Sequence, residues 1–179
     1  MTFPISFKPI EKDSLLINSF TEDDISDEYI SWLNDPIIVK YSNQKFLNHN
    51  IKSCKDYLNS FENSSNLFLK IINKEHDNNT MLGTLTVYIN QYHQTADIGI
   101  MIGHKESWGK GIGKKAWMII LEWLRKSGEI RKITAGTMSC NIGMMKIIES
   151  SGMSLEATRY QQELLDGLPQ DLKYFSFFI

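Results

Sequence analysis

The sequence is poor in the residues that form covalent cross-links or metal sites. Only two cysteines, Cys54 and Cys140, occur in 179 residues, which excludes a disulfide framework and a structural zinc site. The four histidines are scattered along the chain, with no spacing typical of metal ligands. We therefore expect no metal cofactor.

An excess of charge of one sign is also missing. Lys and Arg total 19 and Asp and Glu total 21, so the net charge is −2. A chain with this charge balance lacks the excess of basic residues that gives nucleic-acid-binding proteins a broad basic surface. No run reaches the roughly 18 apolar residues of a membrane span, and no long apolar segment follows a basic start. We expect a cytoplasmic protein that contacts neither nucleic acid nor membrane, with a single domain over residues 1–179.

What the sequence does contain is a hydrophobic period that changes along the chain. Helical spacing of apolar residues predicts helices over 21–33, 51–61, 111–126 and 142–151. Short β-prone or alternating runs predict strands over 15–19, 67–72, 84–89, 96–102, 131–138, 155–164 and 172–178. Polar segments at 74–79 and 90–95 join three of these strands into an antiparallel meander.

The strand over 96–102, the helix over 111–126 and the strand over 131–138 make a βαβ unit, whose two strands run parallel. The strands over 155–164 and 172–178 flank an Asp166-Gly167 turn, which favours an antiparallel hairpin. The predicted fold class is therefore α/β, with a mixed, mostly antiparallel sheet around a central parallel βαβ unit.

The most informative segment is a glycine-rich loop over 106–115, between a strand and an amphipathic helix. Alternate glycines at Gly109, Gly111 and Gly113 let the backbone turn sharply and approach a ligand. The first turn of the following helix offers unpaired N–H groups and the positive end of the helix dipole. Such a junction binds phosphate well.

Two common phosphate-binding motifs do not fit this loop. A Walker loop requires Ser or Thr after its lysine, but Gly111 follows Lys110. A dinucleotide fingerprint starting at Gly109 requires glycine where Lys114 stands.

Residues 96–115 resemble the acetyl-CoA-binding motif of the GNAT acyltransferase superfamily, whose loop reads Q/R-x-x-G-x-G/A. Trp108 stands at the Q/R position, and Gly111 and Gly113 occupy the two small positions. Asn141 matches the asparagine that opens the next helix in such proteins. Further similarities to the ribosomal-protein N-acetyltransferase, or Rim-type, branch lie at 32–36, 155–157 and 165–167.

This resemblance implies a V-shaped cleft where strands 96–102 and 131–138 part, with acetyl-CoA bound in it. It implies that the pantetheine arm pairs with the strand at Ile100, Met101 and Ile102, and that Asn141 contacts the same arm. The pyrophosphate is then expected on the glycine loop, at Trp108, Gly109, Lys110, Gly111, Ile112, Gly113 and Lys114.

The resemblance also implies that an amine attacks the thioester directly, which requires a base to accept the proton of the amine. Glu163 matches the position of the glutamate base in the Rim-type branch. The other candidates are Asp97, Glu156 and His104.

The sequence departs from the Rim-type pattern at the positions that supply a proton to the leaving thiolate. That branch often has a serine where Met144 stands and an asparagine where Met145 stands. Methionine has no proton to donate, so water or another group has to supply it.

We expect an acetyl-CoA-dependent N-acetyltransferase that acts on a primary amine. A small amine or an amino sugar is favoured over a peptide N-terminus, because the chain lacks the charge bias suited to a large charged partner. Two alternatives stay open: a non-catalytic acetyl-CoA-binding sensor or assembly module, which the two methionines favour, and a nucleotide-binding domain without acyl transfer. The expected assembly is a monomer or a homodimer.

Overall fold

A computed structural model describes residues 7–74 and 79–179 of the chain. Its strands are β1 (Ile10–Lys12), β2 (Leu15–Ser19), β3 (Leu67–Asn73), β4 (Thr80–Asn90), β5 (Thr95–Ile102), β6 (Lys132–Met138), β7 (Ser154–Leu165) and β8 (Leu168–Phe178). Its α-helices are α1 (Asp27–Asn34), α2 (Ile51–Asn59), α3 (Ile112–Ser127) and α4 (Ile142–Ser150). Short 3-10 helices lie at η1 (Glu22–Asp24), η2 (Asn43–Phe46) and η3 (Lys105–Ser107).

The described strands form one sheet in the order β1-β2-β3-β4-β5-β6-β8-β7. Every neighbouring pair is antiparallel except β5 and β6, which are parallel and are connected through α3. The predicted mixed, mostly antiparallel sheet around a βαβ unit is therefore confirmed. The predicted meander β3-β4-β5 is also confirmed, although residues 75–78 of its first connection lie outside the described residues.

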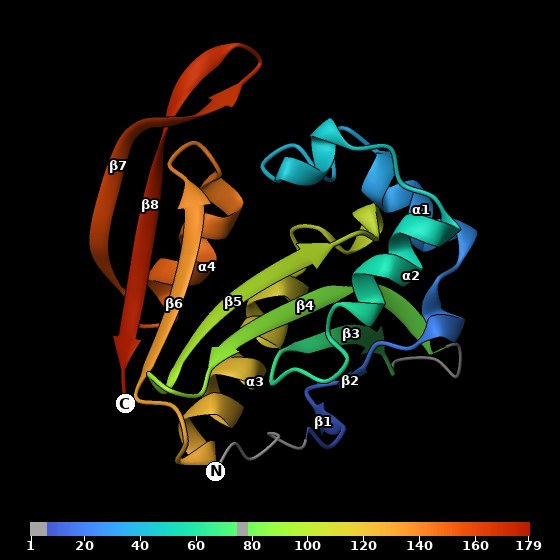
Figure 1. Ribbon diagram of the computed structural model, residues 1–179, viewed down its shortest axis with the longest axis horizontal. Coiled ribbons are helices and arrows are strands. Elements are labelled where there is room, and N and C mark those ends of the chain that lie inside the picture. The colour runs from blue at the N-terminus through green and yellow to red at the C-terminus, as the bar shows by residue number, and fades with distance from the viewer. Residues whose placement is uncertain (1–6, 75–78) are drawn as a thin grey trace.

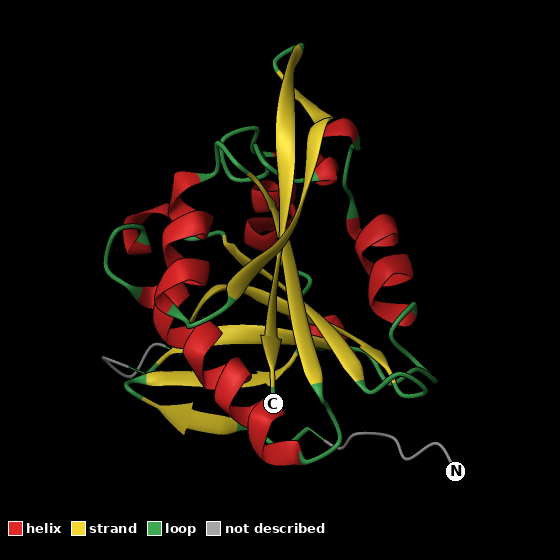
Figure 2. Ribbon diagram, turned by 90° about the vertical axis from the view of Figure 1, so that its left-hand side faces the viewer, coloured by secondary structure: helices red, strands yellow, loops and turns green. Residues whose placement is uncertain are grey.

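Helices cover both faces of this sheet (Figure 1, Figure 2). On one face α3 presents a buried stripe that includes Trp117, Ile120 and Leu124, which joins the main core. On the other face α1 and α2 cover an aromatic cluster that includes Trp32 and Phe68. No helix among the described residues is long and apolar enough to cross a membrane.

The helix predicted over 21–33 is wrong in its first part. Asp24 closes a separate 3-10 turn, because its carboxylate accepts the backbone N–H of Thr21 at 2.7 Å. The α-helix begins only after Ser26, whose hydroxyl accepts the N–H of Tyr29 at 3.1 Å. Two successive capping side chains therefore divide the segment in two.

The feature that positions the site is the separation of β5 from β6. The two strands pair only where residues 95–97 of β5 face residues 132–134 of β6. Beyond this point β6 continues along β8 toward the top of Figure 1, while β5 diverges from it to the right. The part of β5 from Ile98 to Ile102 therefore lacks a strand partner on its β6 side among the described residues, which is the predicted V-shaped opening.

Candidate functional site

A cavity of about 1030 Å³, here called the main cavity, lies against the free edge of β5. It is bounded by the glycine loop, the N-terminal ends of α3 and α4, and the side of α1 and α2. The predicted cofactor residues that line it are Ile100, Met101, Ile102, Trp108, Gly109, Gly111, Ile112, Gly113, Lys114 and Asn141. Lys110 is not among the lining residues.

The glycine loop depends on backbone conformation at one end and on close packing at the other. Gly111, the residue before α3, has φ +79°, and a Cβ placed there would meet no atom within 4 Å. Glycine is therefore needed at position 111 for its left-handed backbone conformation, and not because a side chain would clash with a neighbour. At Gly113 a Cβ would lie 3.1 Å from Cδ1 of Ile147, so the missing side chain lets α3 approach α4 closely.

The N-terminal end of α3 is built to receive an anion. No side chain caps this helix, and the N–H groups of its first turn, Ile112 to Lys114, have no carbonyl partner inside the helix. The helix dipole adds positive potential at the same place. Lys114 and Lys146 also line the main cavity. These donors and charges fit the phosphate groups of a coenzyme.

Trp108 holds the loop against the end of β5. Its indole N–H donates a hydrogen bond to the carbonyl oxygen of Ile102 at 2.8 Å. The side chain is 43% exposed and lines the main cavity. At the position where the resembled motif has a long polar residue, this chain therefore has an aromatic ring that fixes the loop.

Asn141 organises the start of α4. Its side-chain oxygen accepts the N–H of Met144 at 3.2 Å, which caps the helix, and its amide nitrogen donates to the hydroxyl of Thr137 at 3.1 Å. Met144 lines the main cavity, whereas Met145 does not. The asparagine predicted from the resemblance thus has a structural role as a helix cap and also borders the cavity.

The other half of the main cavity is apolar and aromatic. Tyr29 and Tyr57 line it, and burial raises the pKa of both phenols above the usual range of tyrosine, so both stay neutral at physiological pH. The only charged residues among the described lining are Lys40, Lys114 and Lys146. This half therefore suits an uncharged or apolar substituent better than a polycation.

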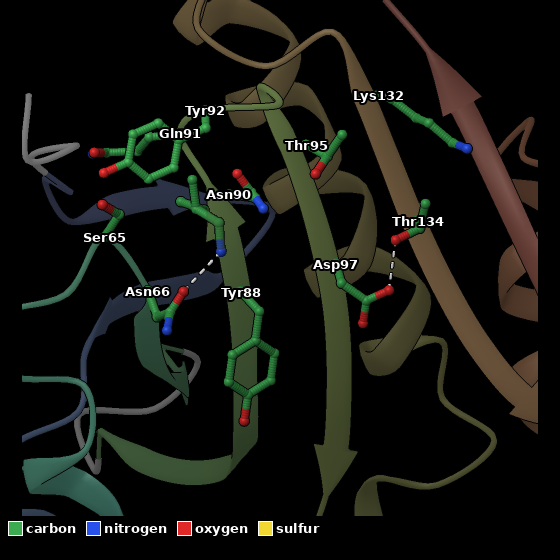
Figure 3. A pocket seen from close by; sticks show the side chains of 11 residues that line it. Ser65, Asn66, Tyr88, Asn90, Gln91, Tyr92, Thr95, Asp97, Lys132 and Thr134 are labelled. Atoms are coloured by element: carbon green, nitrogen blue, oxygen red, sulfur yellow. Dashed lines mark hydrogen bonds between the residues drawn. The ribbon is translucent and has the colours of Figure 1, made fainter. Parts of the chain in front are cut away.

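A second, polar pocket of about 680 Å³ lies farther along β4 and β5 (Figure 3). Asp97 points from β5 toward β6, where the hydroxyl of Thr134 donates to its carboxylate at 2.5 Å. Solvent reaches this carboxylate through the pocket, yet the surrounding protein atoms reduce its hydration. Burial raises the pKa of Asp97 above its ordinary value, and the hydrogen bond from Thr134 opposes that rise.

Glu163, the predicted base, does not line either cavity within the described part of the chain. It lies half-buried on β7 opposite Gln170, close to the β7–β8 turn. The neighbouring carbonyl of Leu164 accepts a hydrogen bond from Lys45 at 3.0 Å, which ties this hairpin to the segment beside the main cavity. Glu163 therefore lies toward the rim, and its catalytic role stays a prediction.

The remaining candidates are engaged elsewhere. Glu156 forms an ion pair with Lys132 on β6. Nδ1 of His104 lies 3.0 Å from the hydroxyl of Ser107, within the loop that follows β5. Neither Glu156 nor His104 lines the main cavity or the polar pocket, so Asp97 is the candidate whose carboxylate opens into one of the two.

Several lining residues were not predicted. Residues 37–42 and Gln44 form one wall of the main cavity, and an irregular loop of this kind has no periodic signal in the sequence. The sequence did carry a signal for Thr84 and Thr86, which form the floor of the main cavity, because they alternate with apolar residues and share one face of β4.

No group of three or more His, Cys, Asp or Glu side chains in the part of the chain that the structure describes could hold a metal ion.

Comparison with known sequences gives a family and two relatives. Residues 14–154 match the family model for the acetyltransferase (GNAT) domain. An uncharacterized protein of Methanocaldococcus jannaschii is 28% identical over 147 residues, which cover 81% of this chain and 29% of that protein. The probable N-acetyltransferase YjcK of Bacillus subtilis is 27% identical over 93 residues, which cover 51% of each chain. The match thus spans about half or less of the length of these relatives.

Solved structures share the whole architecture. RimL, a ribosomal L7/L12 alpha-N-protein acetyltransferase in complex with coenzyme A, has a TM-score of 0.82 at 16% identity, over 96% of this chain and 98% of that one. Spermidine N-acetyltransferase from Vibrio cholerae, in complex with CoA and spermine, has a TM-score of 0.81 at 17% identity, over 93% and 96%. At these identities the likeness establishes the fold.

Proposed function

The chain belongs to the GNAT acetyltransferase domain family, and we propose on this premise that it transfers an acetyl group from acetyl-CoA to a primary amine. The observation that carries the proposal is the main cavity, which joins the free edge of β5 to the anion-binding end of α3. We propose further that residues 1–179 form one acetyltransferase domain.

The residues around the main cavity can hold acetyl-CoA along its length. The unpaired edge of β5 at Ile100, Met101 and Ile102 offers backbone groups to the pantetheine arm. The first-turn N–H groups of α3 and the ammonium groups of Lys114 and Lys146 suit the phosphates. A backbone N–H on this edge is also suited to stabilise the charge that develops on the thioester carbonyl oxygen.

The amine nucleophile has to lose a proton, and we propose that Asp97 accepts it through water in the groove. Asp97 lies on the same face of β5 as Gly99 and Met101, which line the main cavity. Its raised pKa makes it a stronger base than an ordinary aspartate. Glu163 remains the second candidate.

The thiolate of CoA leaves after attack on the carbonyl carbon, and the tetrahedral carbon becomes the amide. Met144, at the position expected of a donor, cannot protonate the thiolate, so water in the main cavity is the proposed source. Because a thiol has a pKa near 8.5, the thiolate can leave before it is fully protonated.

The acceptor is proposed to be a small amine or an amino sugar, with a peptide N-terminus as the alternative. The two solved structures described above are enzymes named for a ribosomal protein and for spermidine, so this fold accepts both protein and small-amine substrates. The absence of carboxylates from the described lining of the main cavity speaks against a polyamine in this chain.

The proposal is tested by thiol release from acetyl-CoA in the presence of single amines. We expect release with at least one primary amine that carries no second cationic group and little with spermidine, because the charged residues in the described lining of the main cavity are all lysines. Release with spermidine alone would contradict the acceptor assignment. If acetyl-CoA binds and no amine causes thiol release, the chain is instead a binding module. Met144 favours that role because it cannot protonate a leaving thiolate.

A further inference from the structure

The polar pocket continues the floor of the main cavity. Thr86 and Gly99 face each other across β4 and β5 and line the main cavity, and the next pair on the same face is Tyr88 and Asp97, which line the polar pocket. The hydroxyl of Tyr57, in the main cavity, lies 2.9 Å from that of Tyr88. The two spaces therefore adjoin along one groove.

The walls of the polar pocket are rich in neutral hydrogen-bonding groups. Of its 11 lining residues, eight carry a hydroxyl or a carboxamide and no charge. The side-chain oxygens of Asn66 and Asn90 accept the backbone N–H groups of Ile89 at 2.8 Å and His93 at 3.0 Å. Their amide nitrogens donate to no described residue, so they are available to a ligand as donors.

The two charges of the polar pocket are engaged within the protein. Thr134 donates to Asp97, and Lys132 forms its ion pair with Glu156. In Figure 3 the ammonium of Lys132 points away from Thr95 and Asp97, toward the neighbouring strand. The pocket therefore offers neither an unpaired cation for a phosphate nor the several carboxylates that a polyamine requires.

These walls suit a ligand whose hydroxyls both donate and accept. We propose that the polar pocket binds the hydroxyl-bearing ring of the acceptor, an amino sugar or an aminocyclitol, while its amine faces the main cavity. Tyr92, whose side chain is 87% exposed at the same pocket, offers an aromatic face to the C–H surface of such a ring. This inference rests on the proposed acetyl transfer and gives it a substrate class.

Thr95 provides a test that leaves the fold intact. Its hydroxyl lines the polar pocket (Figure 3), and Thr95→Val removes the hydroxyl while keeping the β-branched shape that suits β5. We expect KM for an accepted amino sugar to rise about 3- to 10-fold, the worth of one hydrogen bond, with kcat and KM for acetyl-CoA unchanged. Thr158→Val, on β7 and outside both cavities, is the matched control and is expected to change none of these values.

The probes are aminohexoses with the amine at different ring carbons, each free and as a nucleoside diphosphate conjugate. Cyclohexylamine serves as the ring amine without hydroxyls. We expect turnover of an aminohexose in at least one of the two forms. The form with the higher turnover shows whether the acceptor is the free sugar or its nucleoside diphosphate conjugate. Equal turnover of cyclohexylamine, or an unchanged KM in Thr95→Val, would overturn the inference.

Saturation-transfer NMR with the same sugars separates this inference from the proposed reaction. Transfer to sugar protons that weakens in Thr95→Val supports the pocket even if no thiol is released, in which case only the acetyl transfer fails. Thiol release with a non-sugar amine and no saturation transfer from any sugar would overturn the pocket and leave the acetyl transfer standing.

Discussion

Replacement of Asp97 by asparagine is expected to lower kcat for acetyl transfer by about 10²- to 10⁴-fold, the usual contribution of a general base. Asparagine keeps the shape of the side chain and can still accept the hydrogen bond from Thr134. It cannot accept the proton of the attacking amine. The measurement is the steady-state rate of thiol release at saturating acetyl-CoA with an accepted amine.

The same variant is expected to be as stable as the wild type or more stable at neutral pH. Burial raises the pKa of Asp97, so the folded state disfavours the ionised form, and this penalty is fully present above the folded-state pKa. The asparagine side chain carries no charge and hence no such penalty. Thermal unfolding at neutral pH therefore separates a catalytic effect, which leaves the midpoint intact, from damage to the fold.

The pH dependence of the wild-type rate provides a further check on Asp97. The base acts only when deprotonated, so the rate should rise with pH through a pKa above the ordinary value of aspartate. The residual rate of Asp97→Asn should not show this rise with pH. Glu163→Gln tests the second candidate: if Asp97 is the base, this variant should keep kcat within about 2-fold of wild type, because Glu163 lines neither cavity in the described part of the chain. Loss of activity in Glu163→Gln and its retention in Asp97→Asn would assign the base to Glu163.

Gly111→Val is expected to raise the Kd for acetyl-CoA by about 5- to 150-fold, which corresponds to about 1–3 kcal/mol of backbone strain. Gly111 has φ +79°, a conformation that a β-branched residue adopts only at high cost. The loop relieves that strain by leaving the conformation in which the first-turn N–H groups of α3 face the main cavity. Isothermal titration with acetyl-CoA measures the change.

Gly128→Val is the control at the opposite end of the same helix. Gly128 has φ +71°, and a Cβ there also meets no atom within 4 Å, so the valine carries similar strain. It lies at the C-terminal end of α3 and does not line the main cavity. Both variants should lose similar stability, and only Gly111→Val should lose affinity. An equal loss of affinity in both would mean that the loop does not bind the coenzyme.

The order of the α-helices and of the strands from β2 onward was accessible from the sequence, because periodicity reports which face of an element is buried. The three-residue strand β1 was not predicted. The alternation of Leu85 and Val87 with threonines predicted β4, and the spacing of Trp117, Ile120 and Leu124 predicted α3. The error over 21–33 arose because helical spacing alone does not show that Ser26 caps a new helix.

The candidate site could be predicted from the sequence only in part, because sequence patterns reveal segments that are continuous in the chain and not contacts between distant segments. The glycine loop is one continuous segment, so its residues could be predicted together. The wall made by residues 37–42 and the contact of Tyr57 with Tyr88 depend on how distant segments fold over the sheet. The raised pKa of Asp97 depends on burial, which the sequence does not record.

The central claim is that the main cavity, along the free edge of β5, binds acetyl-CoA, and thermal unfolding with the coenzyme tests it most directly. At about 100 times its Kd, acetyl-CoA should add about 2.7 kcal/mol to the free energy of unfolding, which raises the midpoint by roughly 5–10 °C for a chain of this size. ATP and NAD at the same concentrations should raise it much less. No rise with acetyl-CoA over a wide concentration range, or an equal rise with ATP, would contradict the claim.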